Sequence, residues 1–446
     1  MHQSNQFTST FGFLMAATGF AVGLGNIWRF PYITGENGGG AFVIVYLGCA
    51  LIIGIPILLA ELLMGRMGQG NPPLALGHLA RENGASPMWK HAGHLNLLTA
   101  FTIQGTYCVV AGWVLWYLYK AATTGFAEMN VEVAAAQFSN VLDSISGMFV
   151  WTAVALLFTS AIIYAGVNDG IERSVRVLMP TLFLLMVALV MFNATQSGFG
   201  DAIAYLFTPD FSKIDSGTFL AAVGQAFFSI GVGMAGMLIF GSYLPQEVSI
   251  SKCVLIIIVI DTCVALLAGL MIFPMVFRFG MDPSGGPGLI FQTLPVAFAQ
   301  MPGGHFVAIV FFTLLSVAAV TSMVGLMEPL VAWIEDTFDL PRQKATVTVS
   351  VAIGLLGVLS VLSYNVMSNW TIAAMDLNGI LDYLANQIML PLGGLLIAIF
   401  AAWQVKKSSL REQLPLMPDT VFEIWYLLLR FLLPIAIIVI LVTGLS

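Results

Sequence analysis

The sequence predicts an all-α, polytopic membrane protein with about eleven transmembrane helices, each at least about 20 residues long. Of its 446 residues, 59% are hydrophobic and only 9% are charged, whereas soluble domains carry about 25% charged residues. The apolar residues form long continuous runs, such as 41–64 and 255–277. This composition excludes a soluble enzyme, a disordered chain and a nucleic-acid-binding protein.

The predicted spans follow one another along the whole chain. They cover residues 10–34, 40–64, 95–123, 147–166, 174–196, 218–244, 252–278, 304–334, 346–365, 375–403 and 422–445. Transmembrane β-strands would instead show alternation in pieces of about 10 residues. Continuous apolar runs of this length therefore favour helices.

The distribution of basic residues orients the chain. With the N-terminus in the cytoplasm, eleven of the sixteen Lys and Arg residues fall in cytoplasmic loops and three in outer loops. The other two, Arg29 and Arg430, fall inside spans. This excess agrees with the positive-inside rule. Eleven spans then place the C-terminus outside the cell (inner or plasma) membrane. Residues 1–28 hold no Lys or Arg, so a cleaved signal peptide is not expected.

Two spans contain clusters of glycine that weaken a helix. The glycines are Gly19, Gly23 and Gly25 in the first span and Gly231, Gly233 and Gly236 in the sixth. They would either allow close helix packing or break both helices at mid-depth. The breaks are equivalent if spans 1–5 and 6–10 form two halves, about 8–196 and 218–403, followed by an extra helix at 422–445. Paired breaks favour a transporter with a 5+5 inverted repeat and a midplane site.

The residues around the first break resemble a known family. The segment Gly19-Phe-Ala-Val-Gly-Leu-Gly-Asn-Ile-Trp-Arg-Phe-Pro31, followed by Glu36-Asn-Gly-Gly-Gly-Ala-Phe42, is similar to the signature of the neurotransmitter:sodium symporters. The resemblance continues through Glu61, residues 223–228 and residues 318–329, and it covers spans 1–10. It implies sodium-coupled amino-acid uptake by alternating access, with the inverted repeat known for the family. The family commonly has twelve spans, and the oligomeric state of this chain stays open.

The resemblance implies two sodium sites. The first would use the Ala21 carbonyl and the side chains of Asn26, Ser229 and Asp261, completed by the substrate carboxylate. The second would use the carbonyls of Gly19, Val22 and Ala318 and the hydroxyls of Thr321 and Ser322. In an apolar helix, Thr and Ser hydroxyls more often bond the carbonyl one turn back, so the two hydroxyls alone would not indicate a cation site.

The resemblance also implies a substrate site between the broken helices. Helix N-termini carry partial positive charge and suit a carboxylate. The implied contacts are Ala21, Leu24, Gly25, Ile103, Tyr107, Phe228, Ser229, Gly231, Met234, Ser322 and Leu326.

Charged residues outside this site suggest gates. Arg29 and Asp376 resemble the family's outer gate, although each could be a simple interfacial anchor. Asp336 matches the acid of the inner gate. Its usual basic partner is missing, since Ser4 stands at that position, so polar contacts with Tyr243 are the expected substitute.

Two further features follow from the resemblance. Glu61 would bond the unwound backbone, unless it is a helix-end charge near Arg66. Gly170 and Pro180 match a motif that lets the fifth span unwind at its inner end, because proline removes a backbone donor. Opening there would hydrate the second sodium site.

Two positions bear on the substrate and on chloride. Gly23 stands where monoamine transporters of the family carry an acid, so the substrate should bring its own carboxylate, and Gly231 and flexible Met234 favour leucine-sized to aromatic side chains. Asp261 stands where the family generally has Asn, so a fixed carboxylate would make bound chloride redundant, unless it is only a structural acceptor.

Three rival functions fit the sequence less well than a transporter. A channel needs a through-path, which one occluded midplane site does not offer. A membrane enzyme needs a nucleophile beside a base, and no such pair stands out in the sequence. A sensor of the same fold needs a soluble output domain, and the predicted loops are too short to form one.

Overall fold

The computed structural model describes residues 6–284, 286, 288–372 and 375–444, and within them the fold consists of helices joined by turns and loops. The predicted all-α membrane fold is confirmed. Ser4 and residue 445, the end of the last predicted span, lie outside the described residues.

The helices have the following bounds. They are α1 Thr10–Ala21, α2 Phe30–Glu36, α3 Gly40–Cys49, α4 Ile55–Gly68, α5 Pro72–Glu82, α6 Lys90–Thr123, α7 Val131–Asp143, α8 Ile145–Tyr164, α9 Arg173–Ala194, α10 Phe199–Phe207, α11 Ser216–Ile230, α12 Gly236–Ser242, α13 Ile250–Arg278, α14 Leu294–Gln300, α15 Gly304–Phe338, α16 Arg342–Ser363, α17 Leu377–Tyr383, α18 Leu390–Ile399, α19 Lys407–Glu412, α20 Asp419–Leu427 and α21 Leu433–Gly444. Short π-helical segments join several of them, such as Gly25–Arg29 and Val167–Glu172.

The predicted spans correspond to these helices with shifted ends. Nine continuous helices within the described part of the chain are long and apolar enough to cross a membrane, and the bent pair Thr10–Ala21 and Gly25–Glu36 makes a tenth. The sixth predicted span, 218–244, is divided into α11 and α12, which have 15 and 7 residues and are each too short to cross a membrane alone. The division into halves 8–196 and 218–403 stays a prediction.

Both predicted breaks are present. In the first span, Val22 and Gly23 leave the helix between α1 and the π-helical segment Gly25–Arg29, and the axis bends by 45°. In the sixth span, α11 ends at Gly231 in the left-handed conformation (φ +76°), and Gly233 (φ +80°) continues the break before α12. Glycine tolerates these positive φ angles, which explains why the break lies where these glycines cluster.

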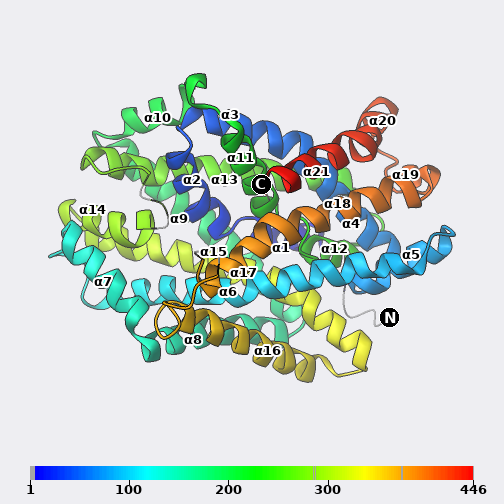
Figure 1. Cartoon of the computed structure of the whole chain (residues 1–446), viewed down its shortest axis with the longest axis horizontal. Helices are drawn as coiled ribbons and strands as arrows, with labels where there is room; N and C mark the ends of the chain where they lie inside the picture. The colour runs from blue at the N-terminus through cyan, green and yellow to red at the C-terminus, as the bar shows by residue number, and fades with distance from the viewer. Residues whose placement is uncertain (1–5, 285, 287, 373–374, 445–446) are drawn as a thin grey trace.

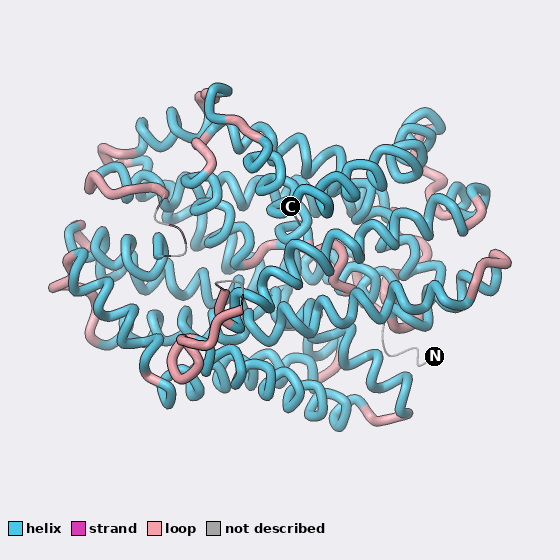
Figure 2. Tube along the Cα trace, viewed as in Figure 1, coloured by secondary structure: helices cyan, strands magenta, loops and turns pink. Residues whose placement is uncertain are grey.

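The long helices run roughly parallel to the long axis of the molecule, and turns gather at its two ends (Figures 1 and 2). Helix α5 lies at one end, while α7, α10 and α14 lie at the other (Figure 1). We call these the N-terminal end and the opposite end. Helix α6 packs extensively on α15, and α12 packs on α4. The two breaks thus lie inside the bundle, where side chains of other helices reach them.

Candidate functional site

Side chains from neighbouring helices satisfy the backbone groups freed at the first break. The Tyr107 hydroxyl accepts a hydrogen bond from the Leu24 amide at 3.0 Å. The Gln225 side chain donates to the Gly25 carbonyl at 2.7 Å. Irregular backbone inside a membrane protein persists only where such partners exist. These contacts therefore hold the break as a defined structure.

The second break is held by Glu61. Its Oε1 accepts a hydrogen bond from the Gly233 amide at 2.6 Å, and the side chain is fully buried. This is the contact with unwound backbone expected for Glu61, rather than a helix-end charge beside Arg66. Arg66 instead bonds the Val248 and Gln413 carbonyls.

A buried polar cluster lies beside the first break. The Asn26 amide donates to the Asp261 carboxylate at 2.7 Å and to the Ser229 hydroxyl at 2.9 Å. Ser229 donates to Asp261 at 2.7 Å, and the Tyr46 hydroxyl lies 3.2 Å from that of Ser229. All four side chains are 0% exposed. The three side chains predicted for the first sodium site are therefore in mutual contact. Their oxygen atoms are ligands of the kind that a hard cation prefers.

The residues predicted for a second sodium site meet where α1 packs on α15. The Ser322 hydroxyl donates to the Phe20 carbonyl at 3.2 Å and lies 3.4 Å from the Gly19 carbonyl. The Thr321 hydroxyl bonds the carbonyl of Val317, one turn back, and that of Ala318 at 3.1 Å. A hydroxyl that donates to a carbonyl keeps lone pairs for a cation, so this bond leaves Thr321 available as a ligand. Val22, the other predicted ligand on this side, is the C-cap residue of α1.

A cavity separates the two breaks. Its lining residues are Phe20, Ala21, Gly23, Gly25, Ile103, Tyr107, Phe228, Gly231, Met234, Ser322 and Leu326. Nine of the eleven predicted substrate contacts line it; Leu24 faces Tyr107, and Ser229 belongs to the polar cluster. Phe20 was not predicted in this site, and Gly23 was predicted to bear on the substrate but not to contact it. A Cβ on Gly23 would collide with the Ser322 hydroxyl.

Arg29 ends the π-helical segment Gly25–Arg29 and lies beside Phe228, which lines the cavity. Its guanidinium stacks on the Phe228 ring, 4.8 Å from the centroid. The acid that interacts with Arg29 is Asp382. The predicted partner, Asp376, caps the start of α17 and accepts a hydrogen bond from the Gly379 amide at 2.7 Å, and its role in an outer gate stays a prediction. Asp382, which interacts electrostatically with Arg29, comes nearly two helical turns later in the same span.

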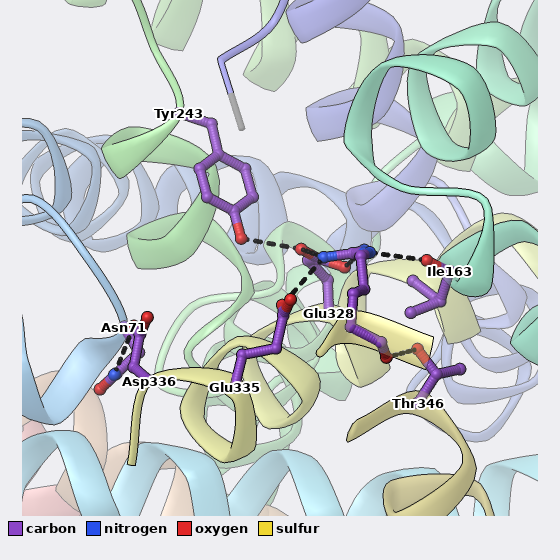
Figure 3. Close-up of polar contacts among 8 residues, drawn as sticks. Asn71, Ile163, Tyr243, Glu328, Glu335, Asp336 and Thr346 are labelled. Carbon is purple, nitrogen blue, oxygen red and sulfur yellow. Dashed lines mark hydrogen bonds and ion pairs between the residues drawn. The ribbon is translucent and has the colours of Figure 1, made fainter. Parts of the chain in front are cut away.

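An ion-pair network centres on Arg342, the first residue of α16 (Figure 3). The Arg342 guanidinium pairs with Glu328 at 2.5 Å and with Glu335 at 3.2 Å, and it donates to the Ile163 carbonyl at 2.8 Å. The Tyr243 hydroxyl donates to Glu328 at 2.8 Å. Glu328 is 0% exposed. These contacts tie α8, α12, α15 and α16 together.

The predicted role of Asp336 needs a correction. Its carboxylate accepts a hydrogen bond from Asn71 at 2.8 Å, away from Tyr243 (Figure 3). Tyr243 instead contacts Glu328 and, through its backbone carbonyl, the Phe7 amide at 3.1 Å. Asp336 lies two turns further along α15 than Glu328, so the two acids reach different partners.

The predicted hinge residues lie on either side of an irregular turn. Gly170 belongs to the π-helical segment Val167–Glu172, which follows Gly166 with φ +100°. A Cβ on Gly170 would collide with the Ile162 carbonyl. Pro180 lies inside α9, where its missing N–H leaves the Arg176 carbonyl without its helical donor. Both features weaken the start of this span.

Several site residues were missed by sequence reasoning. Tyr46, Glu328 and Asp382 are polar side chains in predicted apolar spans, and Arg342 lies just before one. A buried or membrane-embedded charge is costly unless it is paired, so Glu328 and Asp382 carried a usable signal. Their partners lie on other helices and could not be read from the sequence.

The comparisons with known proteins agree with this geometry. The chain matches the family described as "Sodium:neurotransmitter symporter family" over residues 4–141 and 131–446. An uncharacterized sodium-dependent transporter of Bacillus subtilis (strain 168), YhdH, is 34% identical over 98% of this chain and 96% of its own. One from Haemophilus influenzae is 34% identical over 99% of this chain and 98% of its own.

A solved structure is also similar. The crystal structure of MhsT in complex with L-phenylalanine superposes with a TM-score of 0.91 at 40% identity, covering 99% of both chains. The two breaks, the buried oxygen cluster and these matches over essentially the full length lead to one conclusion. The chain belongs to the sodium:neurotransmitter symporter family of membrane transporters.

Proposed function

We propose that this protein takes up hydrophobic L-amino acids, from leucine-sized to aromatic, together with sodium ions, and that it needs no chloride. The observation that carries the proposal is the meeting of both helix breaks around one cavity, with the Asn26–Ser229–Asp261 cluster at its side. Its similarity to MhsT, solved with L-phenylalanine, supports this substrate class.

The cavity favours a substrate that carries its own carboxylate. At Gly23, a side chain would collide with the Ser322 hydroxyl, so no protein acid fits there. The Tyr107 hydroxyl accepts from the Leu24 amide at 3.0 Å and keeps its own O–H as a donor that a carboxylate can engage. The wall opposite is apolar and includes Ile103 and Met234. A zwitterion with an apolar side chain matches both halves of this lining.

Two sodium ions would bind on either side of the break in the first span. One would take Ala21, Asn26, Ser229 and Asp261, next to the substrate carboxylate. The other would take Gly19, Val22, Ala318, Thr321 and Ser322, between α1 and α15. Since the first ion would share a ligand with the substrate, binding of each would strengthen binding of the other.

The ends of the molecule would act as alternating gates. The excess of basic residues predicts that the N-terminal end is cytoplasmic and that the C-terminus is outside. Arg29, Phe228 and Asp382 would close the outer path. The Tyr243–Glu328–Arg342 network would close the inner one.

Substrate class is tested by competition. We expect leucine, phenylalanine, tryptophan and tyrosine to displace a bound labelled amino acid in the presence of sodium. Tryptamine, which lacks the carboxylate, should bind at least about tenfold more weakly, because the Tyr107 hydroxyl and the first sodium ion would lose their anionic partner. Equilibrium binding to purified protein with and without sodium measures both. Strong tryptamine binding with no amino-acid binding would overturn the proposal.

The hinge is tested with Pro180→Ala. Alanine restores the helical donor to the Arg176 carbonyl and favours a helix interior by about 3 kcal/mol over proline. If a third of that difference opposes unwinding, release of sodium into the cytoplasm slows about fivefold. Substrate binding at equilibrium should change less. Pro415→Ala, in the exposed loop between α19 and α20, is the control. Equal loss of transport and binding would argue against a hinge.

A further inference from the structure

Glu172 joins the start of the first span to the start of the fifth. Its side chain is 2% exposed. The carboxylate accepts hydrogen bonds from the Thr8 amide at 2.8 Å, from the Thr8 hydroxyl at 2.7 Å and from the Ser9 hydroxyl at 3.0 Å. Arg176, one turn later, pairs with the same carboxylate. Four donors therefore converge on one buried acid.

The partners of Glu172 belong to the beginning of α1. Ser9 is the N-cap of α1, and its hydroxyl also accepts from the Gly12 amide at 2.9 Å. Gly12 lies so close to Glu172 that a Cβ would collide with the carboxylate. Arg176 donates to both the Thr8 and Ser9 hydroxyls, at 2.9 and 2.7 Å. The start of α1 is thus fastened to α9 by both charges.

Glu172 itself occupies the weakened turn. It is the last residue of the π-helical segment Val167–Glu172, and it lies between Gly170 and Pro180. Unwinding of this segment would move the carboxylate away from Thr8 and Ser9. Conversely, a movement of α1 away from α9 would leave Glu172 and Arg176 without their hydroxyl partners. Leaving a buried carboxylate with fewer donors is costly.

We propose that the Glu172 latch, formed by Glu172, Arg176, Thr8 and Ser9, makes release of α1 and unwinding of the fifth span a single event. Glu172 is a positioning residue for transport and touches neither substrate nor sodium. The inference rests on the proposed function, in which both movements open the cytoplasmic path. It assigns the N-terminal segment an attachment that does not depend on a basic residue at position 4.

The test places the substitution in one span and the readout in the other. Thr8→Val keeps the shape of the side chain and removes one donor to Glu172. We expect amide hydrogen exchange of residues 167–180, measured on the full-length protein in lipid nanodiscs without sodium, to rise about tenfold. Glu172→Gln should raise exchange of residues 7–12 by a similar factor. Asp169→Asn changes an exposed acid in the same turn and should alter neither segment.

Each outcome decides the proposal. Increased exchange in the distant segment for either variant supports the latch, and Thr8→Val suffices if Glu172→Gln does not fold. Increased exchange near the substitution only, or no change, overturns it. Because exchange is measured without transport, a parent protein that fails to take up amino acids would refute the proposed function and leave the coupling result intact.

Discussion

Replacing Asp261 with asparagine is expected to raise the sodium concentration needed for half-maximal substrate binding at least about tenfold, because a cation site would lose its fixed anion. Asp261 is 0% exposed and bonds both Asn26 and Ser229, the side chains proposed as sodium ligands. A charge–charge interaction at such short range in a protein is on the order of a few kcal/mol. The geometry of Asn is close enough to keep the hydrogen-bonded cluster assembled.

The same carboxylate predicts independence from chloride. Two anions beside one sodium ion would repel each other, so the parent protein should take up substrate equally well in gluconate and in chloride. Sodium-driven uptake into proteoliposomes measures this for the parent and for Asp261→Asn. Asp201→Asn, an exposed acid on α10, is the control. Parent uptake that collapses without chloride would refute the prediction. If Asp261→Asn keeps full sodium affinity in gluconate, Asp261 is only a structural hydrogen-bond acceptor.

Arg342→Met is expected to open the N-terminal end of the molecule. It leaves Glu328 buried without its cation, and breaking a buried ion pair costs about 3–5 kcal/mol. The Tyr243 hydroxyl would then donate to a buried carboxylate that has lost its Arg342 cation. If this free energy destabilises only the conformation that is closed to the cytoplasm, the population open to the cytoplasm should increase by a factor of about 100 or more.

Thiol labelling can follow this opening. In a background in which Cys49, Cys108, Cys253 and Cys263 are replaced, Ser242→Cys introduces a reporter beside Tyr243. Ser242 is 5% exposed, so its labelling reports on opening. We expect fast labelling with Arg342→Met and a smaller increase with Tyr243→Phe, which removes one hydrogen bond. Lys344→Met, an exposed cation two residues away, should have no effect. Unchanged labelling with Arg342→Met would show that the network does not close this path.

Much of the architecture followed from local features of the chain. Apolar runs longer than a bilayer is thick predict spans wherever they occur, because each helix satisfies its own backbone. The glycines at 231 and 233 predicted a break, since left-handed backbone favours glycine. The resemblance around Gly19–Pro31 then placed Asn26, Ser229 and Asp261 in one site, and their side chains are in contact.

The contacts between charges on different helices depended on the tertiary structure. Asp376 and Asp382 both belong to the tenth span, yet only packing decides that the first caps its own helix while the second interacts electrostatically with Arg29. Glu328 and Asp336 are two turns apart on α15 and have different partners, Arg342 and Asn71.

The Glu172 latch is the clearest contact of this kind that could not be predicted from the sequence, since Thr8 and Glu172 are separated by 164 positions. Hydrophobic pattern and helix-breaking residues act within a few turns of chain, so the spans, their breaks and the residues beside the breaks could be predicted from the amino-acid sequence. Which charge meets which depends on the rotation and offset of each helix against its neighbours. Rotation and offset are set by the packing of the whole bundle, so these pairings become visible only in the folded protein.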